Sequence, residues 1–240
     1  MGNLTVRGLI AAMAALLITQ KESLAQSNSV DSKPVPVRIG TAPASEIGAL
    51  PPLTSAIGKR AAKAFLKGNW HEARDAYLEI LRSDPDNAPT LTNLGATFLE
   101  LEQYTQARKH LEKALQVNPG LHQARTILGV TYLRSGNSYR AIAALSRVVA
   151  EQPKNARAHN YLAVATLQRG WTAAAERQLQ AAVSADPGFA EAHYNLAIRY
   201  MEKKPPAVEL ARRHYQRAID LGATPSSRLS TRINSTKNDQ

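Results

Sequence analysis

A constant spacing of proline residues constrains this chain more than any other feature. Pro85, Pro119, Pro153 and Pro187 follow one another at intervals of 34 residues, each in a turn-like context at the end of a helical pattern. A fixed period of about 20–50 residues is typical of repeat proteins, in which each unit packs only against its neighbours. The 240 residues therefore predict one elongated repeat domain rather than two compact ones.

Placing the chain on this period aligns small and apolar residues in columns. The columns of the first half of each unit are Leu94, Leu128, Leu162 and Leu196; Gly95, Gly129, Ala163 and Ala197; and Phe98, Tyr132, Thr166 and Tyr200. Those of the second half are Ala73, Ala107, Ala141 and Ala175; Tyr77, Leu111, Leu145 and Leu179; and Ile80, Ala114, Val148 and Ala182. Spacings of three and four residues place such columns on one helical face. Gly68, Gly136 and Gly170 lie between the halves, where a helix can end at positive φ, so each unit is predicted to be a helical hairpin.

The Leu-Gly pair, the aromatic residue after it, the later alanine and the closing proline resemble the tetratricopeptide repeat. This resemblance implies an all-α fold, a right-handed α-solenoid of about five helical hairpins. It covers residues 54–221, divided into units at 54–87, 88–121, 122–155, 156–189 and 190–221. The first unit departs from the pattern and is predicted to be a cap. The fifth holds two extra residues around Pro205 and Pro206, which should displace its second helix.

The segments outside the repeats suggest export. Residues 1–25 combine a positive charge at Arg7 with a short apolar run and small residues, which is typical of a signal peptide; a retained anchor is the alternative. The apolar run is too short to span a bilayer, so no transmembrane segment is expected after cleavage. Residues 26–53, rich in proline and serine, are predicted to be a disordered linker, and residues 222–240 a polar, basic tail. We therefore expect an exported protein, periplasmic or secreted.

No candidate catalytic, cofactor-binding or metal-binding site emerges from the sequence. Cysteine is absent, which excludes thiolate metal sites and thiol nucleophiles, and neither a phosphate loop nor a nucleophile elbow is found. His71 and Glu72 begin a zinc-protease pattern, but Asp75 stands where its second histidine is required. His159 and His193 share a column, and a separation of about 10 Å between stacked helices favours packing or hydrogen bonding over ligation. The chain is predicted not to be an enzyme and to need no cofactor.

The opposite side of each first helix is also apolar, since residues advance by about 100° per position. In proteins that this chain resembles, that side lines a concave groove that binds extended peptides or helices. The residues predicted to line it, called the groove face below, are Thr92, Asn93, Ala96, Leu99, Gln123, Thr126, Val130, Leu133, Arg157, Asn160, Val164, Leu167, Tyr194, Asn195, Ile198 and Met201. Apolar members would hold side chains of a protein or peptide ligand, and amides and hydroxyls would pair with its main chain. The alternative is that second helices or the chain's own ends fill this face.

The charge supports a second hypothesis. A formal net charge of +11 favours acidic partners, and basic residues gather near the first and last repeats. A basic adaptor that binds an anionic envelope polymer or membrane surface is therefore the alternative function. An accessory subunit of an enzyme complex would share the groove of the first hypothesis. Nucleic acid is disfavoured as a partner, because no aromatic residues interleave with the basic clusters.

Overall fold

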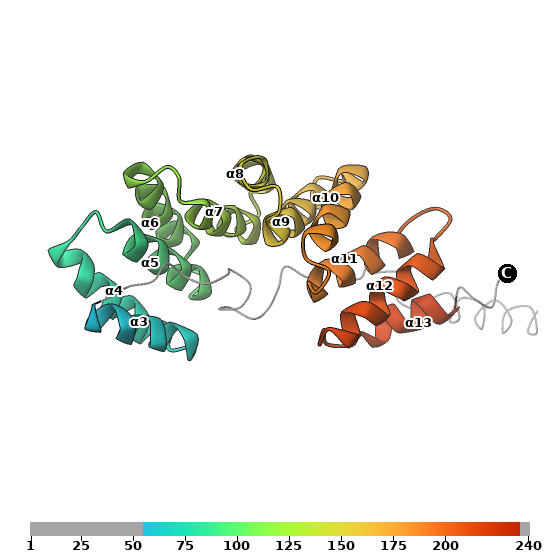
Figure 1. The fold of residues 1–240 in the computed structure, drawn as a ribbon, viewed down its shortest axis with the longest axis horizontal. Coiled ribbons are helices and arrows are strands. Elements are labelled where there is room, and N and C mark those ends of the chain that lie inside the picture. Colours follow the sequence, from blue (N-terminus) through green and yellow to red (C-terminus); the bar gives the residue numbers. More distant parts are fainter. Residues whose placement is uncertain (1–54, 236–240) are drawn as a thin grey trace, which may run out of the picture. The chain divides into compact units, whose positions relative to one another are not determined.

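A computed structural model describes residues 55–235, which form a series of helical hairpins (Figure 1). The helices are α3 (Ala56–Leu66), α4 (Trp70–Ser83), α5 (Ala88–Glu100), α6 (Tyr104–Val117), α7 (His122–Arg134), α8 (Ser138–Glu151), α9 (Ala156–Leu167), α10 (Thr172–Ala185), α11 (Ala190–Met201), α12 (Val208–Asp220) and α13 (Ser227–Ser235). The predicted all-α array of five hairpins is confirmed. The predicted signal peptide and linker lie outside the described residues, as does the end of the tail.

The proline turns both end one hairpin and begin the next. Each second helix stops just before its turn, and at two of the four turns an asparagine then caps the following helix. Asn87 Oδ1 accepts a hydrogen bond from the backbone N–H of Thr90 at 2.9 Å, and Asn155 Oδ1 accepts one from Ala158 at 3.0 Å. Such side-chain caps satisfy N–H groups that have no partner within the helix. The period of the prolines thereby becomes the period of the helices.

The turn inside each hairpin requires a left-handed backbone at one position. Gly68, Gly136 and Gly170 have φ of 76°, 79° and 74°, which confirms the conformation predicted for them. In the second hairpin the exposed Glu102 occupies the same column, with φ of 57°. A residue with a Cβ atom is strained in this region by about 1–2 kcal/mol, so Glu102 is held there by the hairpin rather than by its own preference.

We expect Glu102→Gly to raise the free energy of unfolding by about 0.5–1 kcal/mol, because relief of the strained φ outweighs the added freedom of the unfolded chain. Urea denaturation followed by circular dichroism measures the change. The reciprocal variant Gly136→Ala should lower the same free energy by about 1–2 kcal/mol. A lower midpoint for Glu102→Gly than for the unaltered protein would contradict this account.

Within a hairpin the two helices approach closely at the Leu-Gly column. A Cβ atom added to Gly95 would lie 2.5 Å from Leu111 Cγ, and one added to Gly129 would lie 2.6 Å from Leu145 Cγ. Both leucines are fully buried. Close packing of this kind leaves no room for an extra methyl group without movement of a side chain or of the backbone. The small residues therefore set the distance between the helices.

Gly95→Ala should destabilise the fold, since overpacking costs about 1–3 kcal/mol and exceeds the gain of about 1 kcal/mol in helix propensity. Thermal unfolding measures the loss as a lower Tm. Gly120→Ala is the matched control, because the nearest atom to its added Cβ is Asn118 Oδ1 at 3.4 Å. Equal Tm values for the two variants would refute the packing argument.

Successive hairpins are joined by packing and by hydrogen bonds to the proline carbonyls. The second helix of each hairpin contacts the first helix of the next, and α7 also contacts α5 and α9. Figure 1 shows α6, α8 and α10 on the upper side of the array and α5, α7 and α9 below them. Every proline carbonyl of the 34-residue series accepts a hydrogen bond. The donors are Lys113 Nζ to Pro85 (2.6 Å), Arg125 Nη2 to Pro119 (2.6 Å), His159 Nε2 to Pro153 (3.0 Å) and His193 Nε2 to Pro187 (3.2 Å).

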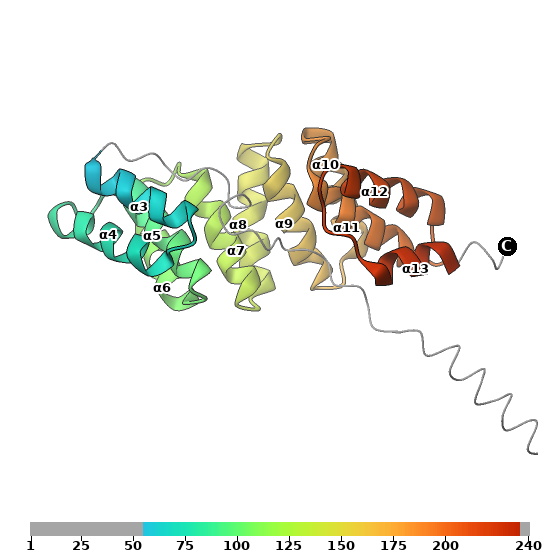
Figure 2. The same cartoon turned by 90° about the horizontal axis from the view of Figure 1, so that it is seen from below.

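The last hairpin absorbs the two extra residues of its turn and is covered by an additional helix. Ala211 and Ala218 of α12 are fully buried, so the predicted pattern persists after the insertion. Helix α13 contacts α11 and α12, beside which it lies in Figure 2. Its Leu229 and Ile233 are buried. The beginning of the basic tail is thus part of the packed array. No helix within residues 55–235 is long and apolar enough to cross a membrane.

Candidate functional site

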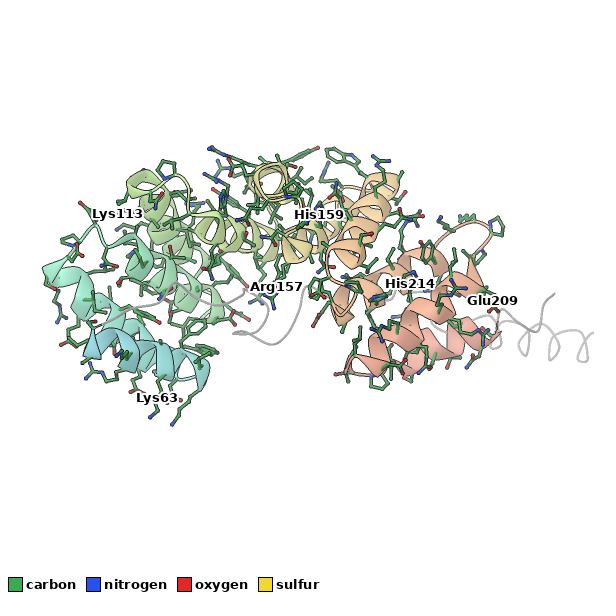
Figure 3. All side chains as sticks on the ribbon, viewed as in Figure 1. Lys63, Lys113, Arg157, His159, Glu209 and His214 are labelled. Carbon is green, nitrogen blue, oxygen red and sulfur yellow. The ribbon has the colours of Figure 1, made fainter. Side chains whose placement is uncertain are left out.

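The groove face is distributed over the four helices α5, α7, α9 and α11. Each helix contributes four residues, three of which occupy the same columns in every repeat, so most of the face repeats with the hairpins. Because α5 contacts α7 and α7 contacts α9, the contributions of these three helices form neighbouring rows. Figure 3 shows Arg157 below α9, and His159 of the same helix near α10. The structure therefore places the predicted residues on consecutive first helices.

Most of this face is buried rather than open. Thirteen of the sixteen residues are buried, and Ala96, Leu99, Val164 and Ile198 have no exposed surface. Gln123 and Leu167 are half-buried, and Arg157 is exposed. In α5 the buried residues run without interruption from Thr90 to Leu99, so the helix is buried around its whole circumference. The accessible part of the groove face is limited to α7 and α9.

Several polar groups of the groove face already have partners. Thr92 Oγ1 donates to Ala88 O at 2.8 Å and Thr126 Oγ1 donates to His122 O at 2.9 Å, both within their own helices. These hydroxyl hydrogens are therefore not available to the main chain of a ligand, in contrast to the role predicted for them. Asn195 Nδ2 donates to Asn160 Oδ1 at 2.9 Å, which links α11 to α9. The asparagine pair fixes the register of adjacent hairpins on this side.

Charged side chains that the sequence analysis did not select lie just beyond the face, at the ends of the first helices. Glu100 and Glu202 occupy the same position of two repeats, and burial raises the pKa of each carboxyl group. Arg134 Nη1 lies 3.7 Å from Glu100 Oε1 and partly offsets that effect. The sequence did carry a signal for this pair, because Glu100 and Arg134 are 34 residues apart and have opposite charges. These groups add a charged border to an apolar face.

Histidines link the last two helices of the array. His193 Nε2 faces the Pro187 carbonyl, which only accepts, so this nitrogen carries a hydrogen. When His193 is neutral its Nδ1 is an acceptor, and His214 Nδ1 donates to it over 2.9 Å. The pKa of His214 is lowered to about 4, chiefly by burial and also by the neighbouring His193 and Arg213. Burial also lowers the pKa of His193. These shifts favour the uncharged form of the pair. The packing and hydrogen-bonding role predicted for His159 and His193 matches their contacts.

The histidine pair predicts loss of stability in mild acid. The unfolded chain protonates His214 near pH 6.5, whereas the folded protein does so only near pH 4. The unfolded state therefore binds more protons between these values, and the free energy of unfolding falls as the pH decreases from about 6.5 to about 4. His214→Gln should show a shallower decrease in urea midpoints measured at pH 7.5, 5.5 and 4.5. The control His71→Gln removes an exposed histidine and should follow the unaltered protein, while parallel curves for all three proteins would contradict the assignment.

The described residues contain no group of three histidine, aspartate or glutamate side chains arranged to hold a metal ion. An open pocket of about 420 Å³ lies between α4 and α6. Leu78, Leu81 and Leu91 line it together with the cations Arg82, Lys109 and Lys113, as well as Pro85 and His110. The pocket presents no carboxylate beside a nucleophile, so its residues offer no acid–base pair for catalysis.

Comparison with known proteins identifies the architecture. Sequence profiles described as tetratricopeptide repeat match residues 60–87, 76–109, 98–165 and 167–228. The chain belongs to the tetratricopeptide-repeat family. The predicted resemblance is therefore confirmed, and proteins of this family are protein-interaction scaffolds that are typically noncatalytic. No match was found among curated proteins.

Solved tetratricopeptide-repeat structures share the fold. PilF of Pseudomonas aeruginosa has a TM-score of 0.69 at 18% identity, over 77% of this chain and 84% of its own. A crystal structure of MamA has a TM-score of 0.59 at 23% identity, over 79% of this chain and 100% of its own. YrrB, described as a TPR protein with an unusual peptide-binding site, has a TM-score of 0.55 at 24% identity, over 74% of this chain and 88% of its own. At these identities the likeness shows the fold alone.

Proposed function

We propose that this protein is a noncatalytic scaffold or adaptor that binds a peptide or protein segment along the groove face. The observation that supports it is the row of apolar residues on α5, α7, α9 and α11, on a side of these helices that the hairpin contact does not use. Proteins keep contiguous apolar surfaces of this kind covered, or use them to bind. YrrB provides a precedent within the fold, since it is described as having a peptide-binding site.

Recognition starts at the accessible part of the face. Arg157, at the start of α9, is exposed and has no ion-pair partner within residues 55–235, while Gln123 on α7 and Leu167 at the end of α9 are half-buried. A guanidinium binds carboxylate or carbonyl oxygens, an amide binds a peptide group, and a leucine binds an apolar side chain. A protein segment that offers all three groups in succession fits this set. Deeper contacts with α5 and α11 then depend on displacement of whatever covers those helices.

The proposal includes an exported location for the protein. The signal-peptide pattern of residues 1–25 supports a periplasmic or secreted location. The alternative function is a basic adaptor for an anionic envelope polymer or membrane surface, which the net charge of +11 favours. Salt distinguishes the two, because binding through exposed charges weakens steeply with ionic strength and apolar contacts do not.

A photo-crosslinking residue, p-benzoylphenylalanine, substituted for Arg157 in the full chain tests the groove. We expect a discrete adduct with one protein of the extracytoplasmic extract, retained in high salt and identified by mass spectrometry. Leu167→Asp in the same background should reduce the adduct about ten-fold, because it places a charge at an apolar contact. Asp at Val130 or Val164 is unsuitable, because these residues are 2% and 0% exposed and the charge would unfold the array.

The control carries the same photo-crosslinking residue in place of Arg82, an exposed arginine on α4. An adduct of equal yield from that position would contradict a site on the groove face. Crosslinks formed only within the chain would show that its own segments fill the face and would overturn partner binding there. Adducts lost at physiological ionic strength would favour the basic adaptor.

A further inference from the structure

Two exposed aromatic residues and an arginine lie together on the turns of the third and fourth hairpins. Tyr139 is 59% exposed and Trp171 is 47% exposed. Their ring centroids are 6.3 Å apart with an angle of 65° between the planes. The guanidinium of Arg169 lies over Tyr139, 4.2 Å from the ring centroid, and its Nη2 donates to Tyr139 Oη at 2.7 Å. These three residues are called the turn patch below.

The repeat geometry fixes the turn patch. Tyr139 lies in the first turn of α8, whereas Arg169 and Trp171 flank Gly170 in the turn that connects α9 to α10. A hydrogen bond from Ser138 Oγ to Gln168 Oε1, at 2.7 Å, joins these two turns directly. The side chains are thus held before any partner arrives, so little conformational freedom remains to be lost on binding.

The turn patch consists of residue types that are enriched at the centres of protein–protein interfaces. Tryptophan, tyrosine and arginine are the residues most enriched where truncation costs most binding energy. Apart from Tyr139 and Trp171, the exposed large hydrophobic side chains within residues 55–235 are the aliphatic Leu66, Val117 and Leu210. Two exposed rings that contact each other are therefore a localised feature of this surface, rather than part of a general exposure of aromatic residues.

The charge of residues 134–184 favours an acidic partner. Residues 134–184 contain seven arginine or lysine residues and two acidic residues, Glu151 and Glu176. Both acids are engaged, Glu151 with Arg125 and Arg147, and Glu176 with Arg199 and Lys203. No ion pair involves Arg140, Arg169 or Arg177 in the part of the chain that the structure describes. The unbalanced cations make an acidic ligand the complementary one.

We propose that the turn patch is a second docking site, separate from the groove face, for an acidic segment of a partner protein. Carboxylates of that segment pair with Arg169 and Arg140, and an apolar side chain between them packs against Trp171. A single nucleic-acid strand fits less well, because stacked bases need exposed, roughly parallel ring faces. Here the rings meet at 65° and Arg169 covers one face of Tyr139.

Fluorescence anisotropy with two labelled synthetic peptides tests this site. One probe repeats Glu-Glu-Leu over twelve residues, and the matched probe replaces every Glu by Gln. The full chain should bind the acidic probe about ten-fold more tightly than the amide probe at low salt. Trp171→Ala and Arg169→Gln should each weaken binding of the acidic probe about five- to ten-fold.

Matched controls carry the same changes on other surfaces. Leu66→Ala removes an exposed apolar side chain from α3, and Arg82→Gln removes an exposed arginine from α4; both should bind the acidic probe as the unaltered protein does. Equal affinity for the two probes, or equal losses in the patch and control variants, would overturn the proposal. So would tighter binding of a twelve-nucleotide oligothymidylate that is lost in the patch variants, which would assign the site to nucleic acid.

Quenching measures the local charge independently of any peptide. The chain has two tryptophans, so Trp70→Phe leaves Trp171 as the sole reporter. Iodide should quench its emission several-fold more strongly than caesium, because the cations around it attract the anion. Equal quenching by the two ions would remove the electrostatic basis of the proposal, whereas the expected difference should shrink in the Arg169→Gln and Arg140→Gln variants.

Discussion

The close contact between the two helices of each hairpin is the constraint on which the rest of the structure depends. Gly95 and Gly129 allow Leu111 and Leu145 to pack almost against the backbone of the first helix. This contact occupies one side of α5 and of α7. The remaining sides then contact the neighbouring hairpins and form the groove face. An array built in this way has few positions at which a first helix meets solvent, which explains why α5 is buried around its circumference.

A second constraint acts between the hairpins, at the proline carbonyls. Proline ends a helical pattern because it lacks an N–H group, and its carbonyl then needs a donor from outside the turn. Arg125, His159 and His193 supply that donor from one column of the following hairpins. The same column holds the apolar Leu91 in the second hairpin, where Lys113 reaches the carbonyl from α6 instead. The hydrogen bond to the proline carbonyl is thus present at every turn, although the donor residue differs.

Features that depend on the period alone could be predicted from the sequence. The helical hairpins, their small-residue columns and the left-handed glycines all follow from the 34-residue spacing. Features that depend on side-chain contacts between different repeats could not be predicted in this way. Tyr139 and Arg169 are 30 residues apart and His193 and His214 are 21 apart, so neither pair shares a column. Periodicity also gave the direction of the groove face but not its burial, because the pattern of one helix does not specify what lies opposite it.

The two surfaces differ in the forces that they can use, and this difference suits a scaffold. The groove face is apolar and mostly buried, so binding there depends on displacement and on contacts that salt affects little. The turn patch is exposed, held in place by Ser138 and Gln168, and surrounded by uncompensated cations, so it attracts an acidic segment from a distance. Arg157 lies in the first turn of α9, whereas Trp171 follows the other end of that helix, so these two residues are well separated. Two sites at different places on one array would let the proposed scaffold hold two segments at once.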